Sequence, residues 1–402
     1  MMNQVSLSDV YWFQEGPGVR NWQFKESGIK LLNVANITKQ GKIDLDKTDR
    51  HLSTEEVDSK YQHFLIDEGD LVIASSGITN DEDNLLRTKI AFIEKQHLPL
   101  CLNTSTIRFK AKDGVSDLKF LKHWLNSLEF RQQITKEVTG IAQKNFGPSH
   151  LKKIKISLPP LTEQRRIASI LDQADELRQK RQQAIEKLDQ LLQATFIDMF
   201  GDPVSNPKGW DLRSVGEISE SKLGKMLDKK KQSSEIDQYK YLRNANVQWF
   251  RFDLSDVFEM EFNEKDRKNC ELKFGDVLVC EGGEPGRAAI WKNDLENCFF
   301  QKALHRVRLD MTQILPEYFV WLFWFYSKNG GFDDHITVAT IAHLTGVKMK
   351  AMQIPIPPLS LQEDFQQKVN EIEVLKTTLE NSSKLFESLF SSLQNQVFNG
   401  TL

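Results

Sequence analysis

Basic and amide side chains that could bind nucleic acid recur at matching places in the two halves of this sequence. Arg87-Thr88-Lys89 follows one Gly-Asp segment, and Gly286-Arg287 follows another. Farther along each half, Gln143-Lys144-Asn145 faces His343-Leu344-Thr345. Arg, Lys and Asn side chains can hydrogen-bond to base edges and contact phosphates. The candidate DNA-binding residues are therefore Arg87, Lys89, Lys144, Asn145, Arg287 and His343; the alternative for each is an ordinary solvated surface side chain.

No catalytic, metal or cofactor motif accompanies these residues. The sequence lacks a Gly-Lys-Ser/Thr phosphate loop, a Gly-x-Ser-x-Gly turn and a His-Glu-x-x-His pair. Neither Pro-Pro pair follows an Asn or Asp that could accept a hydrogen bond from an adenine amine. The histidines and cysteines show no metal-ligand spacing, and the glycine-rich segment 282–286 is interpreted as a turn. We expect a non-catalytic protein that holds no metal or cofactor of its own.

The chain repeats itself at about half its length. Segments 155–164 and 353–362 are both extended and apolar, close with Pro-Pro-Leu, and lie 198 residues apart (353 − 155). Five further pairs follow in the same order: 5–10 with 213–218, 31–36 with 241–246, 68–73 with 274–279, 107–109 with 307–309, and 141–142 with 341–342. Such collinear matches indicate two copies of one module. Lys89 and Arg287 align if the first copy carries a loop insertion.

A long helix is predicted after each Pro-Pro-Leu segment, with Thr162 and Ser360 as possible N-caps. Apolar residues recur at steps of seven along both stretches, which is typical of a coiled coil. An uncovered apolar stripe would be unfavourable in water. We therefore predict that the helices pack on each other, antiparallel; the alternative is that each packs on its own module. The predicted pairing residues are Ile167, Leu171, Leu177, Leu188, Leu191, Ile372, Leu379, Phe386 and Leu393.

The predicted fold class is α+β. Short β-rich runs separated by Gly, Asn and Asp turns precede each helix. This pattern predicts two similar β-rich domains, each followed by a long helix, with the two helices packed as an antiparallel coiled coil of approximate two-fold symmetry. The expected boundaries are 1–155 for the first domain, 156–205 for the first helix and linker, 206–352 for the second domain, and 353–402 for the last helix.

The charge balance and hydropathy exclude several classes of protein. Lys plus Arg is 53 and Asp plus Glu is 56, a net charge of −3, which excludes a uniformly basic DNA-coating protein but not a local basic surface. The longest apolar run, 319–326, is far shorter than the ~20 residues that span a membrane. No targeting segment is visible at the N-terminus, and four unclustered cysteines suit reduced, buried thiols. We expect a cytoplasmic protein that does not enter a membrane.

The ordered set of segments resembles the DNA specificity subunit of type I restriction-modification enzymes. The resemblance rests on segments 156–164, 200–210 and 340–346 and on the Gly-Asp strands, and covers essentially the whole chain. It implies two target recognition domains, each reading one half of a bipartite double-stranded DNA site, and two helices that pair antiparallel. It also implies that two methylation subunits dock on the helices, that restriction subunits join, and that the S-adenosylmethionine and ATP sites belong to these partners.

The chain departs from the family pattern at one position. Leu361-Gln362 stands where the family usually carries Glu-Gln, so any capping or partner contact of that acid is lost in the second copy. Two other functions stay open: a coiled-coil adaptor protein that does not bind DNA, and an enzyme fragment with a hidden nuclease site. The DNA target and the spacer length depend on loop geometry rather than on residue types.

Overall fold

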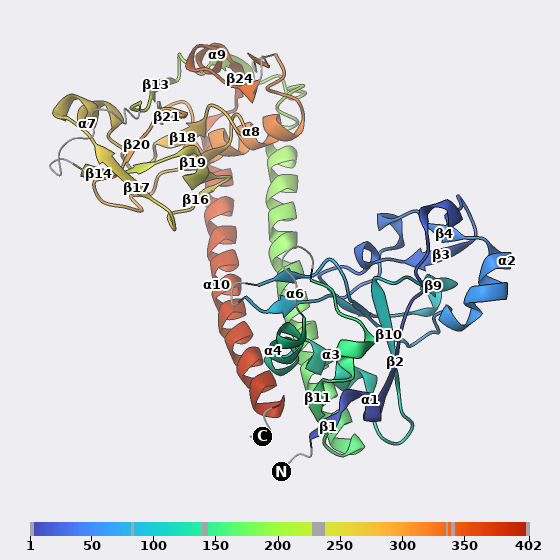
Figure 1. Cartoon of the computed structure of the whole chain (residues 1–402). Coiled ribbons are helices and arrows are strands. Elements are labelled where there is room, and N and C mark those ends of the chain that lie inside the picture. Colours follow the sequence, from blue (N-terminus) through green and yellow to red (C-terminus); the bar gives the residue numbers. More distant parts are fainter. Residues whose placement is uncertain are drawn as a thin grey trace. The chain divides into compact units, whose positions relative to one another are not determined.

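The computed structural model describes residues 4–81, 84–138, 144–226, 238–334, 337–338 and 342–398 (Figure 1). The chain forms two compact units. Unit 1 comprises Met1–Gln182 and Asn381–Leu402, and unit 2 comprises Gln183–Glu380. Two helices of 40 residues each, α6 (Leu161–Phe200) and α10 (Leu359–Phe398), contribute one half to each unit. The predicted domain boundaries, which separate the helices from the β-rich parts, stay predictions.

Unit 1 is built on an antiparallel four-stranded sheet in the order β2-β10-β5-β8. All four residues of β5 are buried, as a central strand requires. A second sheet has the order β4-β3-β9, and β1 pairs with β11 just before α6. The strands are β1 (Gln4–Ser6), β2 (Tyr11–Glu15), β3 (Ile29–Leu32), β4 (His51–Leu52), β5 (Leu71–Ala74), β6 (Thr79–Asn80), β7 (Leu86–Arg87), β8 (Ile90–Phe92), β9 (Leu100–Leu102), β10 (Thr106–Ala111) and β11 (Lys155–Ser157). The shorter helices are α1 (Leu7–Val10), α2 (Thr54–Glu56), α3 (Leu118–Leu125), α4 (Leu128–Glu137) and α5 (Pro148–Leu151).

Unit 2 repeats the order of the two main sheets and the strand pair that precedes the long helix. Its four-stranded sheet has the order β13-β21-β18-β19, its three-stranded sheet the order β17-β14-β20, and β12 pairs with β24 before α10. The strands are β12 (Asp211–Ser214), β13 (Ser219–Leu223), β14 (Gln238–Leu242), β15 (Val247–Gln248), β16 (Arg251–Phe252), β17 (Phe258–Glu261), β18 (Val277–Cys280), β19 (Ala288–Ile290), β20 (Phe299–Phe300), β21 (Leu304–Leu309), β22 (Thr337–Val338), β23 (Ala342–His343) and β24 (Gln353–Ile356). The shorter helices are α7 (Glu264–Cys270), α8 (Pro316–Lys328) and α9 (Gly346–Ala351). The predicted pair of similar domains is present in the fold.

The long helices start two residues earlier than N-caps at Thr162 and Ser360 would place them. α6 begins at Leu161 and α10 at Leu359, so Thr162 and Ser360 lie inside the first turn. The carbonyl oxygen of Pro160 accepts a hydrogen bond from Gln164 N at 3.0 Å, and that of Pro358 accepts one from Gln362 N at 3.3 Å. The second proline of each pair therefore leads directly into the helix, and the predicted N-caps are wrong.

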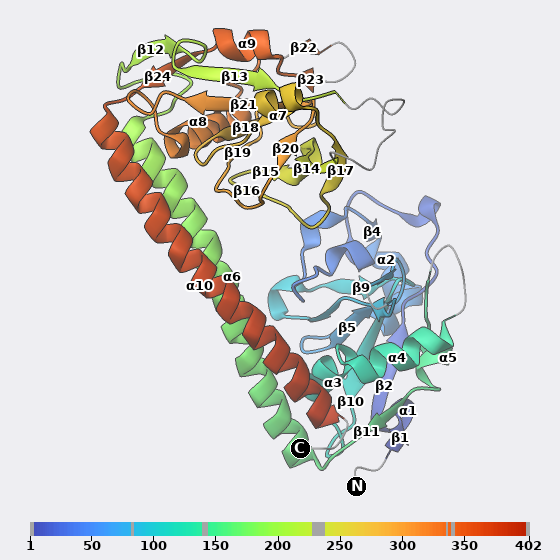
Figure 2. The same cartoon turned by 90° about the vertical axis from the view of Figure 1, so that its left-hand side faces the viewer.

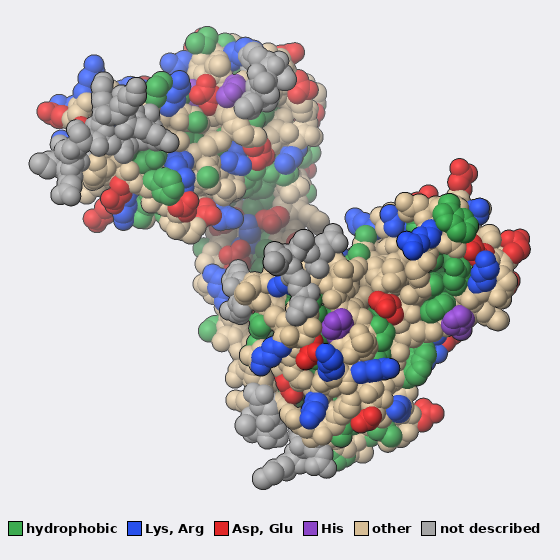
Figure 3. Space-filling view, in the orientation of Figure 1, with side chains coloured by type: hydrophobic (Ala, Val, Ile, Leu, Met, Phe, Trp, Pro, Cys, Tyr) green, Lys and Arg blue, Asp and Glu red, His purple; other side chains and the backbone are tan. Residues whose placement is uncertain are grey.

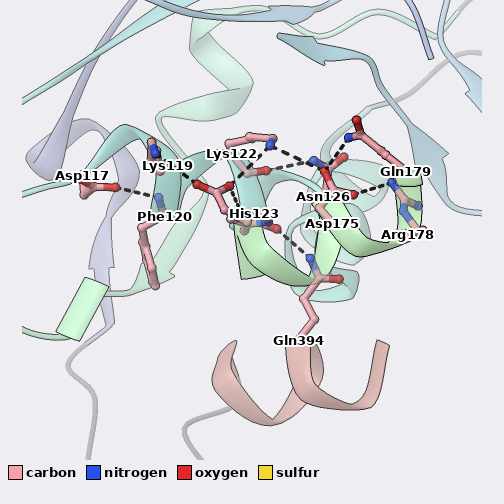
Figure 4. Close-up of polar contacts among 11 residues, drawn as sticks. Asp117, Lys119, Phe120, Lys122, His123, Asn126, Asp175, Arg178, Gln179 and Gln394 are labelled. Atoms are coloured by element: carbon pink, nitrogen blue, oxygen red, sulfur yellow. Dashed lines mark hydrogen bonds and ion pairs between the residues drawn. The ribbon is translucent and has the colours of Figure 1, made fainter. Parts of the chain in front are cut away.

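In unit 1 a polar cluster joins α3 to the two long helices (Figure 4). His123 is 3% exposed, its Nε2 lies 2.8 Å from Asp172 Oδ1, and its carbonyl accepts a hydrogen bond from Gln394 Nε2 at 3.1 Å. Lys119 Nζ lies 3.3 Å from the other oxygen of Asp172. Burial raises the pKa of Asp172, but the hydrogen bond and charge of His123 and the neighbouring lysines outweigh it and lower that pKa to about 2.

In unit 2 aromatic rings join α8 to the same two helices. Phe196 is fully buried, and its ring centroid lies 4.7 Å from that of Phe325, 5.5 Å from that of Phe365 and 5.6 Å from that of Tyr318. Trp321 adds an edge contact to Phe365 at 6.1 Å. These rings belong to the main apolar core of unit 2, which continues under the four-stranded sheet.

The halves of α6 and α10 lie side by side within each unit (Figures 1 and 2). In unit 1, Arg178 Nη1 lies 3.7 Å from Glu387 Oε1, and the Arg181 guanidinium lies 4.8 Å from the ring centroid of Phe386. In unit 2, Lys376 Nζ lies 2.8 Å from Asp189 Oδ1. Within unit 1, the first turns of α6 lie next to Leu393 and Val397, near the end of α10. Later residues of α6 contact earlier residues of α10, so the two helix halves run antiparallel.

The predicted pairing residues fall into three groups. Ile167, Leu171 and Ile372 are buried at 4%, 0% and 8% exposure, and Leu188, Leu379, Phe386 and Leu393 are half-buried. Leu177 and Leu191, in contrast, are 50% and 51% exposed, so their predicted burial is wrong. At ~100° per residue these two leucines lie roughly 80–120° around the helix from Ile167, beyond the edge of the buried stripe.

None of the described helices is long and apolar enough to cross a membrane. The four cysteines, Cys101, Cys270, Cys280 and Cys298, are buried and unpaired, in agreement with the prediction. Burial raises the pKa of the Cys101 and Cys298 thiols to about 12, so neither is a reactive thiolate at neutral pH.

Candidate nucleic-acid interface

Strand pairing shows which residues of the two copies correspond. Arg108 lies opposite Val72 in the β10–β5 pair, and Arg306 lies opposite Leu278 in the β21–β18 pair. Val72 and Leu278 each stand two residues after the Asp of a Gly-Asp turn, so Arg108 corresponds to Arg306 rather than to Arg308. The predicted match of 107–109 with 307–309 is therefore wrong by two residues. The offset is 198 (306 − 108), as at the Pro-Pro-Leu segments.

The second set of candidate residues is also offset by two. Phe146 N donates a hydrogen bond to Ser75 O at 3.0 Å, and Leu344 N donates one to Glu281 O at 2.8 Å. Phe146 therefore corresponds to Leu344, and Asn145 to His343. The sequence placed Gln143 opposite His343; Gln143 lies outside the described residues, as do Ile141, Ala142 and Ile341.

Lys89 and Arg287 occupy corresponding positions, in agreement with the predicted alignment. Their carbonyl oxygens accept hydrogen bonds from Ala74 N at 2.9 Å and Cys280 N at 2.8 Å. Lys89 Nζ donates to Val34 O at 3.2 Å, and Arg287 Nη2 donates to Asn244 O at 3.0 Å. Val34 and Asn244 each begin a one-turn 3-10 helix that follows β3 or β14. Each basic residue thus ties the end of its loop to the neighbouring turn.

The loops that these residues close differ between the copies. Residues 75–88 separate β5 from Lys89, whereas only residues 281–286 separate β18 from Arg287. The longer loop forms the β6–β7 hairpin, with Thr79 opposite Arg87. Leu86 N donates a hydrogen bond to Thr135 Oγ1 at 2.9 Å, and Asp81 forms an ion pair with Arg131 on α4. The inserted hairpin is therefore fixed to α4 at two points.

A groove of about 880 Å³ opens beside this hairpin in unit 1. Its lining includes Lys39, Asn80, Arg87 and Lys89. A second cavity of about 300 Å³ shares Lys39, Arg87 and Lys89 and reaches Lys122 on α3. Burial and the charge of Lys39 lower the pKa of Lys89. In the described ranges no ion pair joins Lys39, Arg87 or Lys89 to a carboxylate, so their charges are available to a bound anion.

Lys144 and Asn145 lie at the same side of the first module. Lys144 Nζ donates a hydrogen bond to Asn80 Oδ1 at 3.1 Å, and the backbones of Lys144 and Ile78 form a β-bridge. Asn145 is exposed. The structure thus brings Arg87, Lys89 and Lys144 together around the hairpin, with Asn145 next to them in sequence.

In unit 2 the corresponding loop is short and partly neutralised. Arg287 Nη1 lies 3.3 Å from Glu284 Oε2, and its side chain is 17% exposed. Gly283 and Gly286 have φ angles of 79° and 86°, and a Cβ at Gly286 would lie 2.4 Å from the Phe332 ring, so only glycine fits there. This agrees with the interpretation of 282–286 as a turn. His343 is exposed and forms a β-bridge with Gly282.

Buried arginines support the sheet beneath both loops. Arg108 is 6% exposed and Arg306 is 1% exposed. Arg108 Nη2 donates to Gln14 Oε1 at 2.9 Å, and Arg306 Nη2 donates to Glu220 Oε1 at 3.1 Å. Arg108 also donates to the carbonyl of Leu65, and Arg306 to that of Glu271, each five residues before the Asp of its Gly-Asp turn. These arginines are structural and do not reach the groove.

Sequence reasoning missed several residues of this region. Lys39, from the segment after β3, and Asn80, in strand β6, line the groove together, and no local pattern marks them. Gly16 and Gly224 had a usable signal, since each follows a matching strand. Their N–H groups donate to Thr106 O at 3.3 Å and Leu304 O at 3.1 Å, and a Cβ at either position would lie 2.5 Å or 2.3 Å from backbone atoms.

The surface of unit 1 is mixed in charge rather than uniformly basic. The face of unit 1 shown in Figure 3 carries Lys and Arg side chains interspersed with Asp and Glu. Across the described residues, no group of three or more His, Cys, Asp or Glu side chains is arranged to hold a metal ion. The arrangement suits an anion such as a phosphate in the groove, with amides nearby for hydrogen bonding.

Comparison with known proteins places this fold in a family. The family model for the type I restriction modification DNA specificity domain matches residues 4–187 and 207–385. The MjaVIII specificity subunit of Methanocaldococcus jannaschii is 30% identical over 186 residues, covering 46% of this chain and 42% of that protein. The EcoKI specificity subunit of Escherichia coli K12 is 23% identical over 304 residues, covering 70% of this chain and 65% of that protein. The chain thus spans less than two thirds of either relative's length.

Solved structures share the fold. A chain from a structure on complex assembly and conformational transition of the type I R-M system has a TM-score of 0.60 at 18% identity, covering 100% of this chain and 98% of that one. The crystal structure of the type I S subunit from M. genitalium has a TM-score of 0.54 at 14% identity, covering 98% and 96%. With the family model matching both halves, this chain belongs to the type I restriction-modification DNA specificity subunits and carries their specificity domain twice.

Proposed function

We propose that this chain is the non-catalytic DNA-recognition subunit of a type I restriction-modification complex, and that each β-rich domain reads one half of a bipartite double-stranded DNA site. The observation that carries the proposal is one framework bearing two different loops. Lys89 and Arg287 make matching contacts, yet the loops they close differ in length and charge. Two domains that share one fold but recognise different DNA sequences need a common framework with different loops.

In unit 1, Lys39, Arg87 and Lys89 would grip DNA phosphates from the groove. Their charges have no carboxylate partner within the described ranges, which favours release of counterions when phosphates replace them. Asn80 and Asn145 carry amides that could hydrogen-bond to base edges, above all to adenine. Lys144 would orient Asn80, since its ammonium group donates to the Asn80 side-chain oxygen.

In unit 2, Arg287 and His343 would contact the second half-site. The ion pair with Glu284 leaves Arg287 less charge to offer than Lys89 has. His343 is exposed and corresponds to Asn145 of unit 1. Its imidazole would contact the second half-site where the Asn145 amide contacts the first. Different groups at corresponding positions are expected if the half-sites differ in sequence.

The two long helices would form an antiparallel coiled coil that sets the distance between half-sites and docks two methylation subunits. Ile170 and Leu177 on one half of α6, and Leu191 on the other, are 40%, 50% and 51% exposed. Apolar side chains in such a row favour a protein partner over water. Restriction subunits would join the complete complex in the cytoplasm, and the S-adenosylmethionine and ATP sites would lie in the partners.

Binding selection with the assembled complex tests the proposal. From a random-sequence library, the complex of this chain with its methylation subunits should select two short blocks separated by unread base pairs. The chain alone should neither methylate nor cut DNA, with or without S-adenosylmethionine or ATP. A complex that assembles but shows no sequence preference would instead support the adaptor function. Turnover by the chain alone would support the hidden nuclease.

A heptad insertion tests the helices as a ruler. One extra heptad in both α6 and α10 keeps the apolar stripe and adds about 10.5 Å at ~1.5 Å per residue. This length equals about three base pairs at ~3.4 Å each, which also rotates one half-site by about 100°. The preferred spacer should lengthen and binding should weaken, while the two blocks stay the same. If a stably assembled variant kept the wild-type spacer, the long helices would not set the distance between the half-sites.

A further inference from the structure

A buried glutamine joins the first recognition domain to the first turn of its long helix. The Gln164 side chain is 0% exposed. Its Nε2 donates hydrogen bonds to Val115 O at 2.9 Å and Pro159 O at 2.8 Å, and its Oε1 accepts one from Asp117 N at 2.9 Å. Asp117 is the N-cap of α3. One amide therefore connects the loop before α3, the extended proline segment and the start of α6.

The second copy contains the same junction. Gln362 is also 0% exposed. Its Nε2 donates to Gln313 O at 3.0 Å and Pro357 O at 2.9 Å, and its Oε1 accepts from Leu315 N at 2.8 Å. Each of these residues stands 198 positions after its counterpart in unit 1 (362 − 164). The side chains around the two junctions differ, so the shared element is the amide and its three main-chain partners.

Glutamine is required here by its hydrogen-bonding groups. Both N–H donors and the oxygen acceptor of the amide are used, and all three partners are main-chain groups. A glutamate would lack the donors and would place a carboxylate against two carbonyl oxygens. An aliphatic side chain would leave two carbonyls and one N–H without this partner beside a fully buried side chain, which is costly. A contact fixed at three points also leaves little freedom for the helix to pivot.

We infer that Gln164 and Gln362 are positioning residues that set the direction in which each long helix leaves its recognition domain. This inference rests on the proposed function, since that direction would then define the distance and rotation between the two half-sites. The adjacent residue is not part of the junction. Glu163 is half-buried, its Oε1 lies 2.7 Å from Arg166 Nη2, and its counterpart in the second copy is Leu361.

The test is a selection from a library in which two fixed half-sites are separated by spacers of random length. The variants are Gln164→Met and Gln362→Met, which keep the side-chain length and remove the hydrogen bonds. The matched control is Gln173→Met on the same helix, where the side chain is exposed. Each junction variant should keep both half-site sequences. Its preference for the best spacer over the next length should fall by about tenfold, equivalent to about 1.4 kcal/mol. The control should keep the wild-type preference.

The outcomes separate this inference from the proposed function. If a junction variant melts at a lower temperature but selects the same spacer as strictly as the wild type, the glutamines are structural only and the inference is wrong. If the wild-type complex selects no bipartite site, the proposed function fails before the junction is tested. Gln164→Asn and Gln362→Asn, which keep the amide but shorten its reach, provide milder variants if a methionine variant does not assemble. They should broaden the spacer preference less than methionine does, and an unchanged preference in both would overturn the inference.

Discussion

At one pair of corresponding positions, the recognition domains meet the long helices through different chemistry in the two units. In unit 1 the contact is polar, with His123 on α3 and Gln394 on α10; in unit 2 the corresponding residues are Trp321 and Phe196. Both pairs are separated by the same 198 positions (321 − 123, 394 − 196). The backbone framework is the same in both cases. The difference shows that the same interface position can be filled by paired polar groups or by packed rings.

Truncating the central ring of unit 2 should have the largest effect. Phe196→Ala removes a fully buried ring that contacts four others, and should lower the free energy of unfolding by about 3–5 kcal/mol. Gln394→Ala, at the corresponding position of unit 1, removes one hydrogen bond to His123 O and should cost about 1 kcal/mol. Denaturant unfolding of both variants measures the difference. Equal losses would mean that the two interfaces do not differ as described.

The Asp of each Gly-Asp turn gives the second comparison. The Asp276 carboxylate accepts two hydrogen bonds from Arg308, Nε to Oδ1 and Nη2 to Oδ2, each at 2.7 Å. In unit 1, Asp70 Oδ2 lies 3.3 Å from Arg108 Nη1, and Asp70 Oδ1 lies 3.8 Å from Lys110 Nζ. Breaking a buried pair by removing one partner costs about 3–5 kcal/mol, and the partial exposure of Arg308 puts its pair with Asp276 at the lower end. Asp276→Asn should approach that loss, and Asp70→Asn should cost less because its ion-pair contacts are longer. Thermal melting of the two variants ranks them, and a larger loss for Asp70→Asn would reverse the ranking.

Lys89 and Arg287 should each affect one half-site only. Lys89→Ala should weaken binding to sites that contain the first block by about 1 kcal/mol and reduce the salt dependence by about one counterion, because a phosphate contact is lost. Arg287→Ala should weaken binding through the second block instead. If Arg287 reads a guanine, preference at that base should relax with a loss of about 1–3 kcal/mol. Titrations at several salt concentrations against sites mutated in either block separate these effects. If one variant weakened binding through both blocks, the assignment of one block to each domain would be contradicted.

Asp172 should make unit 1 sensitive to acid at a position where unit 2 has no carboxylate. Its folded-state pKa of about 2 lies below the ordinary value, so its contribution is present above about pH 4 and is lost as the pH falls toward 2. The corresponding residue of unit 2 is Asn370. Asp172→Asn should therefore lower stability by about 1 kcal/mol or less at pH 6, and the difference from wild type should shrink between pH 4 and pH 2. A difference that is constant with pH would assign no role to the carboxylate.

The sequence predicts the framework better than the site. Two copies, the two long helices and the alignment of Lys89 with Arg287 all follow from spacing. The errors at 107–109 and at Gln143 are both slips of two residues, and a two-residue slip keeps every strand residue on the same face, so alternation cannot reveal it. Leu177 and Leu191 were wrongly predicted to be buried, because a seven-residue repeat does not determine how wide the buried stripe on the helix is. Lys39 and Asn80 line the groove, Asn80 bonds the side chain of Lys144, and the buried glutamines bond main-chain groups. These contacts join residues distant in sequence, and local patterns do not report them.

The central claim, that one chain reads two half-sites with its two domains, is tested most directly by mapping methylated adenines in DNA from cells that carry this chain and its partner subunits. The account predicts methylation only within sites made of two short sequence blocks at a fixed spacing. Exchanging residues 75–88, the hairpin loop of unit 1, for another sequence should then change one block and leave the other block and the spacer unchanged. Methylation at a single continuous sequence, or a loop exchange that alters both blocks together, would contradict it.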